Sequence, residues 1–129
     1  MTLSMEDKVI YDSNVWIASM ITQDSLHQKA ISLISENTLP TLISQDVIAE
    51  IITVLKRLKK LGQAKTFVDM IYANKEIEIL TSTAYYQDTI DCFLSSNDTK
   101  LSFVDMSLVV LSQKYQIETF DKALKAAIA

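Results

Sequence analysis

The stretch Val9-Ile10-Tyr11-Asp12-Ser13-Asn14 decides the fold, because a short apolar run stops at a carboxylate followed by two small polar residues. An apolar run of this length that ends at such residues is typical of a buried strand. Val15-Trp16-Ile17 follows at once and favours a short helix that reaches Ile21. The sequence therefore predicts a strand that delivers Asp12 to the start of a helix.

Three further short strands are predicted along the chain, at residues 41–43, 77–80 and 117–120. Helices alternate with them. Asp24-Ser25 offers an N-cap for a helix over 26–37, and Ser44 offers one for a long amphipathic helix that Gly62 should end. The remaining helices are expected over residues 63–74, 83–95, 103–115 and 122–128.

This alternation of strands and helices is typical of an α/β domain with a parallel sheet. We expect a three-layer α/β/α sandwich around a central parallel sheet of four to five short strands. A chain of 129 residues is the size of one domain, so residues 1–129 should form a single unit.

The composition bounds the environment and partners. One cysteine, Cys92, allows neither an intramolecular disulfide nor a cysteine zinc site, and it is expected in the core. The start of the chain, residues 1–8, is polar, and no apolar stretch is long enough to span a membrane, so we expect a cytoplasmic protein. The chain is 49% hydrophobic with a mean hydropathy of +0.18, which leaves apolar surface for a homodimer or a dedicated binding protein.

The sequence excludes several kinds of site. A single glycine, Gly62, rules out the glycine-rich loops that cradle phosphates or dinucleotides. The only histidine, His27, should start a helix and has no nucleophile elbow to pair with. Trp16 is expected to pack in the core rather than to stack on a base.

The net charge of −4 shows no overall basic field, so contact with a nucleic acid would need a local patch. The chain has one basic cluster, formed by Lys56, Arg57, Lys59 and Lys60. It either complements the dipole at a solvated helix end or contacts RNA phosphates.

Four acids fall where a parallel sheet forms its sites, beyond the carboxyl ends of the strands. Asp12 ends the first predicted strand and Asp121 the fourth. Glu50 lies in the second turn of the helix after the second strand, and Asp105 lies in the first turn of the helix over 103–115. Each has apolar neighbours, where an unpaired carboxylate is costly to bury. Asp12 and Asp121 could each simply cap the helix that follows, and Ser102 with Asp105 has approximately the spacing of a capping box, with Asp in place of Glu or Gln. Glu50 is harder to explain in structural terms alone.

Converging carboxylates without a balancing Lys or Arg repel one another, so some are protonated or a cation lies between them. Oxygen ligands favour Mg²⁺ or Mn²⁺. Such an ion activates a water and stabilises charge on a phosphoryl group.

The ordered set of motifs resembles the PIN domain family. It consists of Asp12-Ser13-Asn14, Glu50 within Val47-Ile48-Ala49-Glu50-Ile51, Asp105 within Ser102-Phe103-Val104-Asp105-Met106, and Thr119-Phe120-Asp121. The resemblance covers nearly the whole chain. The length of the chain is similar to that of the small VapC-like PIN ribonucleases that act as toxins of type II toxin–antitoxin pairs.

The resemblance implies a Mg²⁺- or Mn²⁺-dependent endoribonuclease that cleaves single-stranded RNA, and an antitoxin protein as partner. Asp12, Glu50, Asp105 and Asp121 would then be the catalytic and metal-binding set. Asn14, Thr119 and Ser13 match polar positions that support the site. Many relatives have one more strand after the position of Asp121, which leaves open how the sheet edge is finished.

Two other functions remain open from the sequence. One is a catalytically inactive PIN-like module that acts by protein association, with the acids kept as caps. The other is a PIN nuclease of RNA processing rather than a toxin. A response-regulator receiver would need an Asp after the third strand, where Leu80-Thr81 stands, and a haloacid-dehalogenase phosphatase would need an acid at Asn14.

Overall fold

The computed structural model describes residues 7–129, so the predicted polar start at residues 1–8 lies almost wholly outside the described residues. A four-stranded parallel sheet with the strand order β3-β2-β1-β4 forms the centre of the fold. The strands are β1 Val9–Tyr11, β2 Thr41–Ser44, β3 Ile77–Leu80 and β4 Gln116–Glu118. The α/β class, the parallel sheet and the position of each predicted strand are therefore confirmed.

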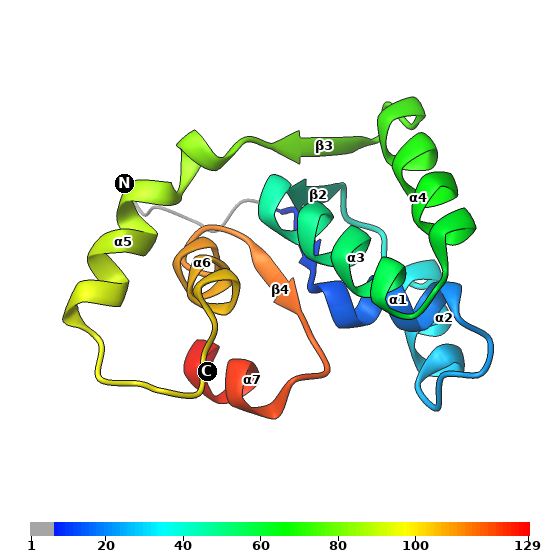
Figure 1. The fold of residues 1–129 in the computed structure, drawn as a ribbon. Coiled ribbons are helices and arrows are strands. Elements are labelled where there is room, and N and C mark those ends of the chain that lie inside the picture. The colour runs from blue at the N-terminus through cyan, green and yellow to red at the C-terminus, as the bar shows by residue number, and fades with distance from the viewer. Residues whose placement is uncertain (1–6) are drawn as a thin grey trace.

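Helices gather in two groups on opposite sides of the sheet (Figure 1). One group comprises α1 Ser13–Met20, α2 His27–Ser35, α3 Gln45–Arg57 and α4 Leu61–Ala73. The other comprises α5 Tyr86–Ser95, α6 Phe103–Leu111 and α7 Lys122–Ile128, with a short 3₁₀ turn η1 Ser82–Ala84 before α5. This arrangement is the predicted three-layer sandwich.

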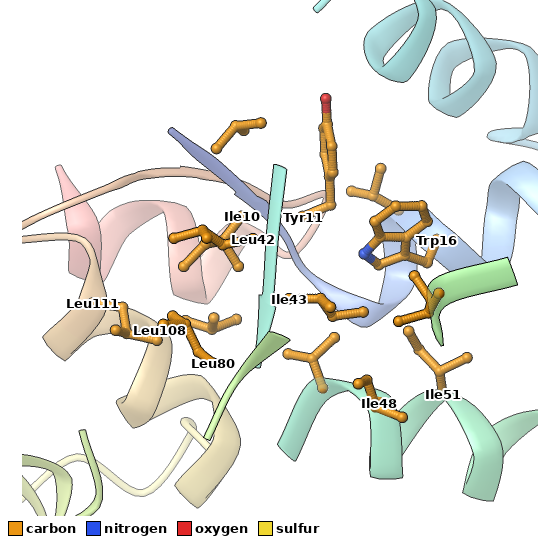
Figure 2. Close-up of a cluster of buried hydrophobic side chains, with 14 of the residues drawn as sticks. Ile10, Tyr11, Trp16, Leu42, Ile43, Ile48, Ile51, Leu80, Leu108 and Leu111 are labelled. Atoms are coloured by element: carbon orange, nitrogen blue, oxygen red, sulfur yellow. The ribbon is translucent and has the colours of Figure 1, made fainter. Parts of the chain in front are cut away.

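The core fills both faces of the sheet because successive strand residues point to opposite sides. Figure 2 shows Ile10 and Leu42 on the side of α6, where they face Leu108 and Leu111. Ile43 lies on the other side, near Ile48 and Ile51 of α3.

Trp16 is buried, and its ring meets that of Tyr11 edge to face with 5.4 Å between the ring centroids, so its predicted core role is confirmed. Cys92, which was expected in the core, is only half-buried on α5. No helix within residues 7–129 is long and apolar enough to cross a membrane.

Helix starts follow the predicted polar residues in most cases. The Ser44 hydroxyl accepts the Val47 N–H at 3.1 Å and caps α3. Ser102 and Asp105 form a complete capping box at the start of α6, since each side chain accepts the backbone N–H of the other at 3.0 Å. The second helix is the exception, because it begins at His27 after a Leu26 that provides no side-chain cap. Asp24 instead accepts the Leu26 N–H at 2.8 Å and closes the preceding turn.

Gly62 does not end the long helix, so that prediction is wrong. Helix α3 stops at Arg57, and Gly62 lies in the first turn of α4. Lys59 takes the left-handed conformation, with a φ of 60°, that glycine commonly supplies after a helix. The Lys59 N–H bonds to the Lys56 carbonyl at 3.0 Å and the Lys60 N–H to the Leu55 carbonyl at 2.8 Å, which is a Schellman motif built without glycine.

Three other predicted elements differ in their ranges from the observed ones. The helix expected over 103–115 ends at Leu111 and gives way to a turn in which the Tyr115 N–H bonds to the Leu111 carbonyl. The helix expected over 83–95 is divided at Tyr85 into η1 and α5. Strand β4 ends at Glu118, so Thr119 and Phe120 form a short link to α7.

Candidate active site

Asp12 leaves β1 at the carboxyl edge of the sheet and is only 3% exposed. It is the N-cap of α1, and its Oδ1 accepts the Ser13 N–H at 2.7 Å. Its Oδ2 accepts the hydroxyl of Thr119 at 2.7 Å, a distance typical of a strong bond to a charged acceptor. Both oxygens of this carboxylate are therefore fixed by the fold.

Thr119 connects the link after β4 to the segment after β1. Its hydroxyl donates to Asp12 and also accepts the Asp121 N–H at 3.0 Å and the Asn14 Nδ2 at 3.3 Å. The Asn14 Oδ1 in turn accepts the Phe120 N–H at 3.2 Å. Asn14 and Thr119 thus lie beside Asp12, as expected for supporting polar residues.

Glu50 reaches this group from α3 through Ser13. The Ser13 hydroxyl donates to the Glu50 Oε1, and Ser13 itself is buried. Helices α1 and α3 pack side by side, which brings the second turn of α3 beside the first turn of α1. Glu50 is half-buried, so it retains access to solvent.

The charges around Asp12 are unbalanced. Burial raises the pKa of Asp12 above its ordinary value, the hydrogen bonds from Thr119 and Ser13 oppose that rise, and the negative charges of Glu50 and Asp105 add to it. No ion pair between described residues involves any of the four predicted acids. Glu50 and Asp105 therefore both lie within electrostatic range of Asp12, and no described Lys or Arg forms an ion pair with any of the three.

Asp105 and Asp121 cap the starts of α6 and α7, in addition to any role at the site. Asp105 accepts the Ser102 N–H in the capping box of α6, although its charge still acts on Asp12. The Asp121 Oδ1 accepts the N–H groups of Ala123 at 2.8 Å and Leu124 at 3.4 Å at the start of α7. The Asp121 N–H bonds to the same Thr119 hydroxyl that donates to Asp12, so the backbone of Asp121 is part of the network while its carboxylate caps α7.

The residues fit a divalent cation in their chemistry. Within residues 7–129, no three His, Cys, Asp or Glu side chains are close enough to chelate one ion together. However, Mg²⁺ commonly takes one or two carboxylates and keeps several waters. A buried carboxylate with two further carboxylates nearby and no Lys or Arg is the environment that such an ion neutralises.

The sequence did not single out a second polar contact at the same edge. Tyr85 is buried, and its hydroxyl donates to the Asp46 Oδ2 at 3.0 Å in the first turn of α3. Asp46 lies one helical turn before Glu50, and no sequence spacing signals its contact with Tyr85, which is 39 positions away.

The basic cluster lies around the far end of α3. Lys56, Arg57 and Lys59 are exposed and Lys60 is half-buried. Lys56 follows Glu50 by six positions, which is roughly 9 Å along a helix. His27 begins α2, as expected, and its Nδ1 bonds to the Ala18 carbonyl at 2.8 Å.

Comparison with known proteins agrees with the fold. The crystal structure of Mycobacterium tuberculosis VapC20, a sarcin–ricin loop cleaving toxin, has the same fold, with a TM-score of 0.82 over 92% of this chain and 94% of that chain at 21% sequence identity. No curated protein sequence matches significantly. The PIN domain family model matches residues 9–128, which is nearly the whole chain. The chain therefore belongs to the PIN domain family.

Proposed function

We propose that this protein is a Mg²⁺- or Mn²⁺-dependent endoribonuclease that cleaves single-stranded RNA, and that it is the toxin of a toxin–antitoxin pair. The observation that carries the proposal is the environment of Asp12, a buried carboxylate beside two others with no neutralising cation among the described side chains. Membership of the PIN family and the shared fold with VapC20 support it.

Asp12 would bind the ion with one of Glu50 and Asp105 at most, and the other would hold it through a bound water, since no three carboxylates of residues 7–129 lie close enough to chelate one ion together. Asp121 is a fourth candidate that would have to leave its cap on α7 or act through water. When bound, the ion would activate water for attack on a phosphodiester and stabilise the charge on the leaving oxygen.

The protein's own residues would position this chemistry. Thr119 and the Ser13 N–H hold the two oxygens of Asp12, so this carboxylate cannot rotate freely. Ser13 holds the Oε1 of Glu50 and leaves its Oε2 available to orient a water or to bind the ion. Asn14 holds the link after β4 in place with both ends of its amide group. Its Nδ2 donates to the Thr119 hydroxyl, and its Oδ1 accepts the Phe120 N–H.

The contacts with partners would extend beyond this edge of the sheet. Lys56, Arg57 and Lys59 are exposed and, with Lys60, form the basic cluster that would contact RNA phosphates. Large apolar side chains on α4 and α5 are also exposed, which supports an antitoxin or a second copy as a protein partner. They are Leu61, Met70, Tyr72, Tyr86, Phe93 and Leu94.

A second candidate is a PIN-like module that acts only by protein association. The capping bonds of Asp105 and Asp121 favour it, because both acids have a structural task without any metal. The same enzyme acting in RNA processing would need no antitoxin, and the coding neighbourhood would distinguish it from a toxin.

The test is a cleavage assay on single-stranded RNA with Mn²⁺, with wild type compared with Glu50→Gln. A glutamine can still accept the Ser13 hydroxyl through its Oε1, so the fold should persist while cleavage is lost. Glu76→Gln is the matched control, because Glu76 is exposed just before β3 at the opposite edge of the sheet. Full activity of Glu50→Gln, or no metal-dependent activity of the wild type, would reject the nuclease.

A further inference from the structure

The first turns of α5 and α6 bring two aromatic rings together at the edge of the sheet that carries the acids. Tyr86 is the first residue of α5 and Phe103 the first of α6. Their ring centroids lie 5.8 Å apart with the planes tilted by 56°. Tyr86 remains 51% exposed, so a large part of its ring is available to another molecule.

Neighbouring residues connect this pair to the helices that carry two of the acids. On one side, Tyr85 is buried and its hydroxyl bonds to Asp46, one turn before Glu50 on α3. On the other side, Phe103 precedes Asp105 by two residues within the capped first turn of α6. The exposed ring of Tyr86 therefore lies against the first turn of α6, the turn that also carries Asp105.

An exposed aromatic residue at this place needs an explanation. The hydroxyl of its neighbour Tyr85 has a protein partner in Asp46, whereas none of the hydrogen bonds among described residues involves the Tyr86 hydroxyl. The acids beside it would repel RNA phosphates in the absence of a bound cation. An apolar ring face is neutral, and it attracts nucleobases by stacking whatever their sequence.

We propose that Tyr86, supported by Phe103, is a stacking position for a nucleobase next to the scissile phosphate of single-stranded RNA. The inference rests on the proposed nuclease function and deepens it, because it gives the site a contact for the base in addition to contacts for the phosphate. Stacking would orient the strand across the acids while tolerating any base, so sequence preference would have to come from elsewhere. Tyr86 is a positioning residue in this scheme and takes no part in the chemistry.

The experiment measures binding in the Glu50→Gln background, so that the RNA is not cut. Two labelled single-stranded oligonucleotides of about 12 residues are compared in the presence of Mn²⁺, one with bases and one in which every nucleotide is abasic. Tyr86→Ala should weaken binding of the base-bearing strand about fivefold or more and leave binding of the abasic strand unchanged. Tyr86→Trp should restore the affinity, since it restores the ring.

Tyr72→Ala is the control, because Tyr72 is 67% exposed near the end of α4, just before β3 and at the opposite edge of the sheet. If Tyr86→Ala does not fold, Tyr86→Leu keeps an apolar contact with Phe103 but cannot stack. Equal losses for both oligonucleotides, or no loss for either, would overturn the inference. RNA cleavage by wild type distinguishes failure of the stacking position from failure of the nuclease function. If wild type cleaves RNA and Tyr86→Ala does not change RNA binding, only the stacking position is rejected. If wild type does not cleave RNA, both proposals are rejected.

Discussion

Thr119→Val removes the hydroxyl that connects the segment after β4 to Asp12. Valine has nearly the same shape as threonine, so the change at this buried position leaves packing almost intact and acts on hydrogen bonds alone. Three bonds are lost: one donated to Asp12 at 2.7 Å, one accepted from Asp121 at 3.0 Å and one accepted from Asn14 at 3.3 Å.

The bond to the Asp12 carboxylate should contribute most to the loss. A hydrogen bond to a charged group stabilises by about 1.5–3 kcal/mol, and a neutral one by about 0.5–1.5 kcal/mol. Asn14 and the backbone of Asp121 are half-buried and can turn to water, so their share is at the low end. We expect the free energy of unfolding to fall by about 2–4 kcal/mol. The pKa of Asp12 should rise further, because the Thr119 bond is one of the two contacts that lower it.

Urea unfolding without metal measures this loss, with the exposed Thr22→Val as the control. If Thr119→Val lowers the free energy of unfolding by less than about 0.5 kcal/mol, the network does not hold Asp12 in the way described. If Thr22→Val lowers the free energy of unfolding by the same amount, the effect is a general one of replacing a threonine hydroxyl with a methyl group.

Three further predictions follow from the site and its helix ends. Because the folded pKa of Asp12 is raised above 3.8, its contribution to stability is full at low pH and is lost as the pH rises through the raised value. Asp12→Asn in chelator should therefore lose less stability than wild type from pH 4 to about pH 7 in thermal denaturation, and parallel curves would contradict this. Ser44→Ala should lower the free energy of unfolding by about 1 kcal/mol, because the cap of α3 is lost. Urea unfolding measures this, with the exposed Ser32→Ala as the reference. No change in the free energy of unfolding would show that the cap contributes nothing. Mn²⁺ at 100 times its dissociation constant should stabilise wild type by about 2.7 kcal/mol. Asp105→Asn can keep its helix cap but should show a much smaller rise in melting temperature at the same Mn²⁺ concentration. An equal rise in both proteins would remove Asp105 from the metal set.

The sequence located the strands well, because short segments with apolar or alternating residues between turn signals define a strand within narrow limits. Asp12, Asn14 and Thr119 were also placed correctly beside one another. Their separation of 105 to 107 positions gives no local signal, so this placement came from the family resemblance rather than from spacing.

The failures have physical reasons. Lys59 adopts a left-handed conformation that the sequence rules assign to glycine, so Gly62 was taken for the helix end. The contact between Tyr85 and Asp46 joins residues 39 positions apart, and neither residue type signals such a partner. The cap that Asp121 forms on α7 was one of the alternatives left open by the sequence, and its place in the metal set stays a prediction.

The hydrogen bond between Asp12 and Thr119 also has a consequence for biosynthesis. The two residues are separated by 107 positions, so Asp12 leaves the ribosome long before the hydroxyl that fixes it. At about 5–20 residues per second, roughly 5 to 20 seconds of translation lie between them. Strand β4, which pairs with β1, emerges equally late. A nascent chain with Asp12, Glu50 and Asp105 already translated thus lacks an assembled site. A nuclease built in this way would be inactive toward the RNA around it until almost the whole domain had been made.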